Sequence, residues 1–249
     1  MMRIGRELTA SDAKDYAWMP FSARSTCTLV RDHFLYSKTK KIKESCLSRY
    51  TGPKLKIMRA LGVELPGLSR KSIANRNYPP GQHGQKSRRP SDYGVRLKEK
   101  QKLRFNYGLT ERQIQILFKE AKSAHGPTGD KLLELLERRL DNLVFRAGFA
   151  PNAVAARQLV RHRHVRLNGR LVNIPSIRVK PGDTVSLTDK GARIPATAEC
   201  LQTPVLTRPE WIRFEASTRS ATVTRLPAAD EVPFPIEVQH VVEYYAVRL

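Results

Sequence analysis

The sequence predicts an α+β protein in which helices come first and a small antiparallel sheet follows. Apolar residues recur at helical spacing from about position 91 to position 161, and after position 164 they alternate with polar residues. Hydrophobic residues form 40% of the 249 residues and charged residues 27%, which is typical of a folded chain. The length permits one to three domains and is sufficient for a hydrophobic core.

The first expected elements are a loop and a long helix. The loop covers residues 75–90, NRNYPPGQHGQKSRRP, in which Pro79 and Pro80 prevent a helix. It is rich in hydrogen-bond donors and poor in carboxylates, a composition suited to contact a phosphate backbone. Ser91 is expected to cap the helix that follows, which runs to about Asn106.

Two further helices are expected between positions 110 and 148. Thr110 and Gln113 have the spacing of a capping box, so a helix should start directly after Thr110. Thr128 is expected to precede one continuous helix, in which leucines recur at helical spacing until Gly148 ends it.

A short helix and two strand pairs complete the expected elements. Pro151 and Asn152 are expected to open a helix over residues 153–161. The Asn168-Gly169 pair favours the type I′ turn of a hairpin. Residues 177–187, with a Pro-Gly-Asp turn, are expected to form a second strand pair. The region from 137 to 190 therefore predicts two helices followed by a small sheet.

Positive charge is concentrated in one part of the chain. The formal net charge is +22, and residues 38–106 alone carry +15, whereas residues 191–249 carry −1. A basic surface that is merely solvated does not require such a concentration, so the pattern favours a surface that contacts nucleic-acid phosphates. A solvated basic face stays open as the alternative.

A second basic cluster begins within the expected helix at 153–161. Seven cationic or titratable residues occur within fourteen positions, with no carboxylate among them. They are expected to converge on the phosphates of a folded RNA, with little direct reading of bases. The seven are Arg157, Arg161, His162, Arg163, His164, Arg166 and Arg170.

The sequence gives no reason to expect catalysis, a metal or a cofactor. Cys27, Cys46 and Cys200 form no CxxC pair, so neither a zinc site nor a disulfide framework is predicted. His83 has no second ligand at a useful spacing. No apolar stretch is long enough to cross a bilayer, so no membrane partner is expected.

A resemblance to a known family rests on seven segments of the sequence. They are SRYTGPKLKIMRALG at 48–62, PPGQHGQ at 79–85, SDYGVRLKEKQKLRFNYGLTERQ at 91–113, LLELLERRLDNLVFRAGFA at 132–150, ARQLVRHRHVRLNGRLVNIPS at 156–176, PEWIRF at 209–214 and VVEYYA at 241–246. Together they resemble the family of small-subunit ribosomal protein number four, in its bacterial and chloroplast form.

The resemblance implies a helical domain with an inserted RNA-binding module, after which the chain returns to the first domain. The corresponding divisions are a basic helical domain at 47–136, the RNA-binding module at 137–200 and a returning segment at 201–249. Residues 1–46 have no counterpart in the family. They are either a true extension or an upstream stretch that is not translated, because Leu47 stands where the family begins.

The resemblance also implies a function. It implies a structural constituent of the small ribosomal subunit that binds the five-prime domain of small-subunit ribosomal RNA, nucleates assembly and contributes to translational accuracy. The implied partners are this RNA, ribosomal protein number five and other small-subunit proteins, and binding to its own messenger RNA stays open. The implied location is the cytoplasmic ribosome of a bacterium, with the chloroplast ribosome as the alternative.

RNA contact is expected in both basic regions. The family motifs and the second basic cluster assign it to Arg49, Tyr50, Lys54, Arg88, Arg89, Tyr93, Arg96, Lys98, Lys100, Lys102, Arg104, Tyr107, Arg157, Gln158, Arg161, His162, Arg163, Arg166 and Arg170. The three tyrosines among them either stack on unpaired bases or belong to the core with the hydroxyl at its rim.

Two rival functions share the RNA-binding module. A pseudouridine synthase would need a catalytic aspartate such as that of the Arg139-Leu140-Asp141 triplet. Here Asp141 falls inside an amphipathic helix, where it is expected to cap the helix or pair with Arg138, Arg139 or Arg146, and too few residues follow position 190 for a catalytic domain. The other rival is a small heat-shock or stalled-ribosome factor that binds RNA transiently and would wash away in moderate salt.

Overall fold

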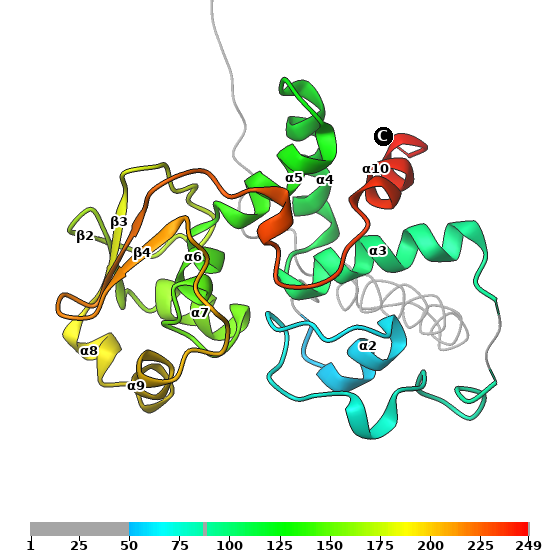
Figure 1. Ribbon diagram of the computed structural model, residues 1–249, viewed down its shortest axis with the longest axis horizontal. Coiled ribbons are helices and arrows are strands. Elements are labelled where there is room, and N and C mark those ends of the chain that lie inside the picture. The colour runs from blue at the N-terminus through cyan, green and yellow to red at the C-terminus, as the bar shows by residue number, and fades with distance from the viewer. Residues whose placement is uncertain (1–49, 87–88, 249) are drawn as a thin grey trace, which may run out of the picture. The chain divides into compact units, whose positions relative to one another are not determined.

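The computed structural model describes residues 50–86 and 89–248, which belong to one compact unit of residues 49–249. The expectations for residues 1–46 lie outside the described residues. The helices are α2 (Lys54–Leu61), α3 (Asp92–Asn106), α4 (Glu111–Ser123), α5 (Thr128–Glu137), α6 (Leu140–Arg146), α7 (Ala153–Arg161), α8 (Asp189–Ala192), α9 (Pro195–Gln202) and α10 (Val238–Ala246), with single 3-10 turns at Ala74–Arg76 and Ala229–Glu231 (Figure 1).

Three helix starts follow the capping chemistry that the sequence predicts. The hydroxyl of Ser91 accepts a hydrogen bond from the backbone N–H of Gly94 at the start of α3. Thr110 and Gln113 exchange the two hydrogen bonds of a capping box before α4. The Oδ1 atom of Asn152 accepts from the N–H of Ala155 at the start of α7. Each cap satisfies backbone donors that lack a partner within the helix, which fixes where the helix begins.

The prediction of one continuous helix up to Gly148 is wrong. The helix starts at Thr128 itself and ends at Glu137, and α6 starts at Leu140 after Arg139 adopts an extended conformation. The N–H of Leu140 donates to the carbonyl of Ile177 at 2.8 Å, so a segment from later in the chain supplies the partner that the helix would have supplied.

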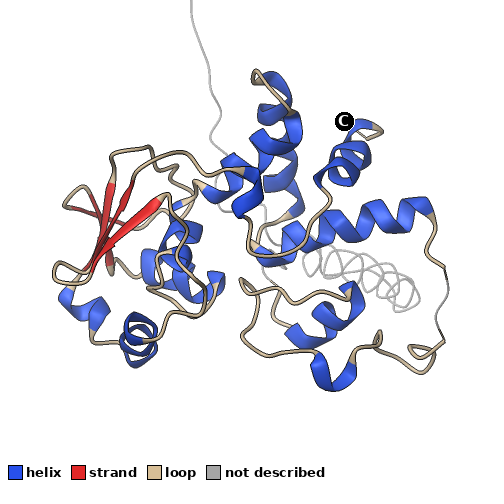
Figure 2. Ribbon diagram, in the orientation of Figure 1, coloured by secondary structure: helices blue, strands red, loops and turns tan. Residues whose placement is uncertain are grey.

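The strands are β1 (Val165–Leu167), β2 (Arg170–Val172), β3 (Thr184–Leu187), β4 (Ile212–Glu215) and β5 (Ser220–Val223). They form one antiparallel sheet in the order β2-β1-β3-β5-β4, so the predicted α+β class is confirmed (Figure 2). Asn168 and Gly169, between β1 and β2, both have positive φ values of 50° and 80°, as a type I′ hairpin turn requires.

The predicted second strand pair does not form. Only β3 is a strand, and it pairs with β1 and β5. Residues 177–179 instead contact the break between α5 and α6 through the bridge of Arg178 to Arg139 and the bond from the N–H of Val179 to the carbonyl of Arg138. The turn before β3 is held by a bond from the N–H of Gly182 to the carbonyl of Val223 in β5.

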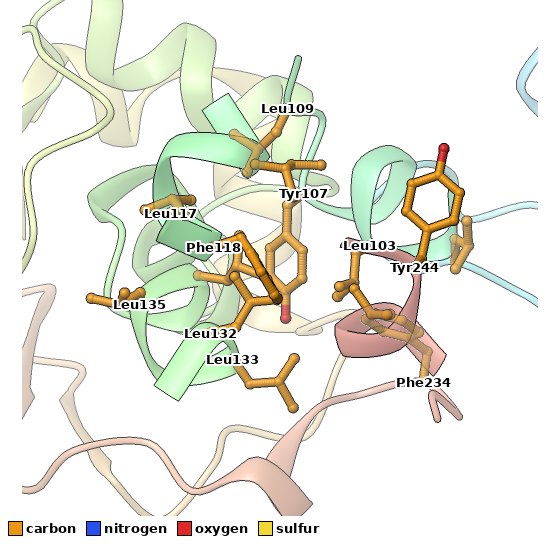
Figure 3. Packing of buried hydrophobic residues seen from close by; sticks show 14 of the residues in the cluster. Leu103, Tyr107, Leu109, Leu117, Phe118, Leu132, Leu133, Leu135, Phe234 and Tyr244 are labelled. Carbon is orange, nitrogen blue, oxygen red and sulfur yellow. The ribbon is translucent and has the colours of Figure 1, made fainter. Parts of the chain in front are cut away.

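Two hydrophobic clusters form the interior of the part of the chain that the structure describes. In the first, residues of α3, α4 and α5 pack with those of α10 (Figure 3). The ring centroids of Phe118 and Tyr245 lie 4.9 Å apart. In the second, α6 and α7 cover one face of the sheet, with Trp211 1% exposed. Residues of β4 and β5 belong to this second cluster and residues of α10 to the first, so within the described residues 201–248 only the part after Val223 packs with the first cluster. The predicted domain boundaries stay predictions.

Candidate nucleic-acid interface

A cluster of basic and polar side chains lies at the end of α7. This helix buries Ala156, Leu159 and Val160 in the second cluster and leaves Gln158 and Arg161 exposed. The alternation of buried and exposed positions follows from helical periodicity, because residues three and four apart share a face. The apolar face therefore fixes the direction of the polar one.

The chain leaves α7 through a Schellman motif with an unusual residue at its centre. The N–H of His164 donates to the carbonyl of Leu159 and the N–H of Arg163 to that of Val160, both at 3.0 Å. Arg163 has a φ of 62°, a left-handed conformation that glycine normally supplies at this position. An arginine here costs backbone strain and places a cation at the helix end.

Gln158, Arg161, His162 and Arg163 are exposed neighbours, and we call them the α7 surface. Three of its residues, together with Val154 and Arg157, line a hollow of about 510 Å³, which we call the basic hollow. Among the residues that the structure describes, neither Arg161 nor Arg163 forms an ion pair. No described carboxylate therefore competes with another anion for these two charges.

The hairpin cations do not both converge on this surface. Register places Arg166 opposite Leu171 and Ser186, on the outer face of the sheet, whereas Arg170 is opposite Leu167 on the face that carries the core. Both side chains are exposed. The two hairpin arginines therefore point to opposite faces, which contradicts the predicted convergence of all seven residues, while RNA contact by the residues at the end of α7 stays a prediction.

Arg157 is used inside the fold. Its Nη2 atom donates to Asp141 Oδ2 at 2.7 Å and to the carbonyl of Tyr107 at 3.1 Å, and its Nη1 atom donates to the carbonyl of Gly108 at 2.6 Å. These bonds link α7 to the turn after α3. Internal acceptors occupy four of the five N–H donors of this guanidinium, which leaves it little capacity for the predicted RNA contact.

Asp141 has a structural role as well. It is 3% exposed and accepts from Arg139 Nη2 at 3.0 Å in addition to Arg157, so two guanidinium groups hold its carboxylate. The predicted pairing with Arg139 is confirmed, and Arg157 is the partner that the sequence did not indicate. A carboxylate occupied in this way is unsuited to act as the nucleophile of a pseudouridine synthase.

The cations of α3 are mostly paired with carboxylates of the same chain. Lys100 is 4% exposed, and its Nζ atom lies 2.8 Å from Glu111. Lys102 pairs with Glu99 at 2.6 Å. Burial and pairing are the physical reasons why the predictions of RNA contact for Lys100 and Lys102 are not supported.

Arg96, one helical turn before Lys100 on α3, is also paired. Its Nε atom lies 2.8 Å from Glu243 of α10. This hydrogen bond lowers the pKa of the Glu243 carboxyl, because it favours the ionised form. Both side chains stay partly exposed, so Arg96 keeps donors for another acceptor.

The three tyrosines differ in exposure. Tyr107 is 3% exposed and its hydroxyl donates to Glu137 at 2.5 Å, so of the two alternatives Tyr107 takes the one in the core. Burial raises the pKa of Tyr107 and also that of Glu137. Tyr50 and Tyr93 have exposed rings, although the Tyr93 hydroxyl accepts a bond from Arg248 at 2.9 Å.

The remaining predicted residues fall into two groups. Arg89 and Lys98 are exposed, Lys54 is half-buried at the start of α2, and the guanidinium of Arg104 lies over the ring of Phe105. Arg49 and Arg88 lie outside the described residues. RNA contact by all of these residues stays a prediction.

Arg213 is a candidate that sequence reasoning missed. It is exposed on β4, and register pairs it with Thr222 and, through β5, with Thr184, on the same outer face as Arg166. The alternation of apolar and polar residues in IRFE was the available signal.

Within the described residues, neither a metal-binding group nor a membrane-spanning helix occurs, and one cysteine is a free thiol. Residues 50–86 and 89–248 contain no group of three side chains that could hold a metal ion, while Cys27 and Cys46 lie outside these ranges. Cys200 is a free, buried thiol whose pKa is raised by burial. Every helix within the same ranges is too short or too polar to span a bilayer.

Two family models match consecutive parts of the chain. The family model described as ribosomal protein S4/S9 N-terminal domain matches residues 49–137, and the S4 domain model matches residues 138–185. The chain is 62% identical over 205 residues to small ribosomal subunit protein uS4 of Methylobacillus flagellatus and 60% identical to uS4B of Nitrosomonas europaea, covering 82% of this chain and all of each relative. It is 47% identical to uS4c of Cyanophora paradoxa over 80% of its own length and all of that protein.

Proposed function

The chain belongs to the ribosomal protein S4 family, and from this membership we propose that it binds small-subunit ribosomal RNA directly through the α7 surface. The family consists of structural ribosomal proteins and not of enzymes. The observation that carries the proposal is the presence of two exposed arginines, Arg161 and Arg163, with no carboxylate partner among the described residues. Cations left without internal partners are the expected ligands of phosphates.

Binding of the full chain to naked small-subunit RNA tests this proposal. We expect Arg161→Gln to weaken binding and to reduce the slope of log K against log salt by about 1, because one phosphate contact is lost. Arg225→Gln is the matched control, since it removes the same charge from an arginine already paired with Glu231 at 2.8 Å. Equal salt slopes for the two variants would contradict a phosphate contact at Arg161.

The finer assignments of the family extend the proposal. The target is the five-prime domain of the RNA, and binding there nucleates assembly and contributes to translational accuracy. Ribosomal protein number five is the proposed protein neighbour, and the protein's own messenger RNA is a further proposed ligand. These assignments are supported by the family motifs quoted above. Chemical footprinting on naked small-subunit RNA tests the first of them, and protection confined to another domain would contradict it.

The proposed location is the ribosome of a bacterium. It is supported by the higher identity to the proteins of Methylobacillus flagellatus and Nitrosomonas europaea than to that of Cyanophora paradoxa. A structural constituent should be present once per small subunit after a wash in moderate salt. Loss of the protein in that wash would favour a transient factor instead.

A further inference from the structure

A second hollow adjoins the basic hollow and differs from it in chemistry. It has a volume of about 150 Å³, and its walls include Ala155 and Leu159 of α7 and Ile194, Ala196 and Thr197 at the start of α9. Most of these side chains are apolar, so we call it the apolar hollow. A space of this size can hold one flat group.

The two hollows share a border. Gln158 and His162 line both of them, and Arg161 lines the basic one. His164 also lines the apolar hollow, with its ring centroid 6.2 Å from that of His162. One amide and two imidazoles therefore line the apolar space, and the cation of Arg161 lies on the basic side of the border.

This combination of groups fits a ligand with a flat, weakly polar body attached to an anion. A nucleotide whose base has left the stack has this form. An imidazole can stack on a base, and the amide of Gln158 offers both donors and an acceptor to a base edge. A phosphate next to the base would lie against Arg161, where no described carboxylate competes for it.

We propose that the apolar hollow receives one unstacked base of the bound RNA, with the adjoining phosphate on Arg161. The inference rests on the proposed function and adds a specific contact to it. The α7 surface then does more than neutralise phosphates, because it recognises a position where the RNA strand is unpaired. The interface acquires a preference for folded RNA with such a nucleotide over continuous duplex.

Filling the hollow tests the inference. In Ala196→Leu an exposed alanine at the wall gains a side chain that occupies the space without changing the charge. We expect affinity of the full chain for naked small-subunit RNA to fall about 5- to 150-fold, the effect of losing one stacked base, while the salt slope stays unchanged. Ala216→Leu, at an exposed turn between β4 and β5, is the matched control and should bind as the parent does.

Base-specific chemical probing of the same complexes supplies the second readout. We expect one unpaired base that is protected by the parent protein to become reactive with Ala196→Leu, while the phosphate protections persist. Ala155→Leu fills the hollow from the α7 side and should expose the same base.

The outcomes separate the two proposals. Parent-like affinity of both filled variants, or weaker binding with every base still protected, overturns the base pocket while leaving RNA binding by the α7 surface intact. Failure of the parent protein to bind the RNA overturns the proposed function and the pocket together. Thermal unfolding of each variant must match that of the parent, and Ala155→Leu decides the matter should Ala196→Leu unfold early.

Discussion

On α3, Arg96, Lys100 and Lys102 each face a carboxylate of the same chain, whereas at the end of α7 neither Arg161 nor Arg163 faces any described carboxylate. The two regions look alike in sequence because both are rich in cations. They differ in what surrounds them once folded, since carboxylates of α4 and α10 lie beside α3. The density of cations in a sequence segment therefore overestimates how many of them can contact RNA. The cations that the fold leaves without a carboxylate partner are the better candidates.

The largest expected effect is on the cations that pair with a buried carboxylate, Arg139 and Arg157. Asp141→Asn would leave Arg139 and Arg157 without their shared buried carboxylate. Uncompensated buried charge is costly, so we expect the free energy of unfolding to fall by about 3 to 5 kcal/mol in urea denaturation. Asp230→Asn, at an exposed aspartate, should change it by less than about 0.5 kcal/mol. Equal effects would mean that the Asp141 network is not structural.

A smaller loss is expected for the paired lysine of α3. Glu111→Gln removes the charge that faces Lys100 while keeping an acceptor for the hydroxyl of Tyr245. Hydrogen bonds to charged groups contribute roughly 1.5 to 3 kcal/mol, and Glu111 is partly exposed, so we expect a loss near 1 to 2 kcal/mol. RNA affinity should stay the same, and a variant that binds RNA more tightly would show that released Lys100 reaches the RNA.

Arg163 belongs to the α7 surface, and its backbone is strained where the α3 cations are stabilised by ion pairs. Arg163→Gly relieves a left-handed conformation and should stabilise the protein by up to about 1 kcal/mol. It should also weaken RNA binding and lower the salt slope by about 1. Thermal unfolding and RNA binding measured on one preparation check both signs. Stabilisation without weaker RNA binding would contradict a contact between Arg163 and the RNA.

The elements that the sequence predicts well are those with local causes. The caps at Ser91, Thr110 and Asn152 and the turn at Asn168-Gly169 depend on residues within a few positions of each other. The break after Glu137 depends on the distant carbonyl of Ile177, which no local pattern contains. Tertiary partners of this kind override helix periodicity.

The same distinction applies to the candidate site. The α7 surface was predictable because its sequence segment holds no carboxylate, so pairing required a partner from elsewhere. The ion pairs of the α3 cations could not be predicted from the sequence, since the partner of Arg96 is 147 positions away on α10 and that of Lys100 lies on the next helix. The internal hydrogen bonds of Arg157 could not be predicted either, because its acceptors, the carbonyls of Tyr107 and Gly108, come from a turn that only the fold brings near.

The smallest expected effect concerns a paired cation outside α3. Arg178 donates through Nη2 to Glu120 at 2.6 Å, and this hydrogen bonding lowers the pKa of Glu120 below its ordinary value of 4.5. A carboxyl whose pKa is lower in the folded state stabilises the fold above pH 4.5, and that contribution disappears as the pH falls through the folded-state pKa. Both side chains are more than a third exposed, so solvent screening limits the contribution to about 0.5 kcal/mol. We therefore expect Arg178→Gln to lose about this much at pH 7 and to match the parent once Glu120 is protonated, in urea unfolding followed across that range. A deficit that persists in acid would mean that Arg178 stabilises the fold by packing rather than by its charge.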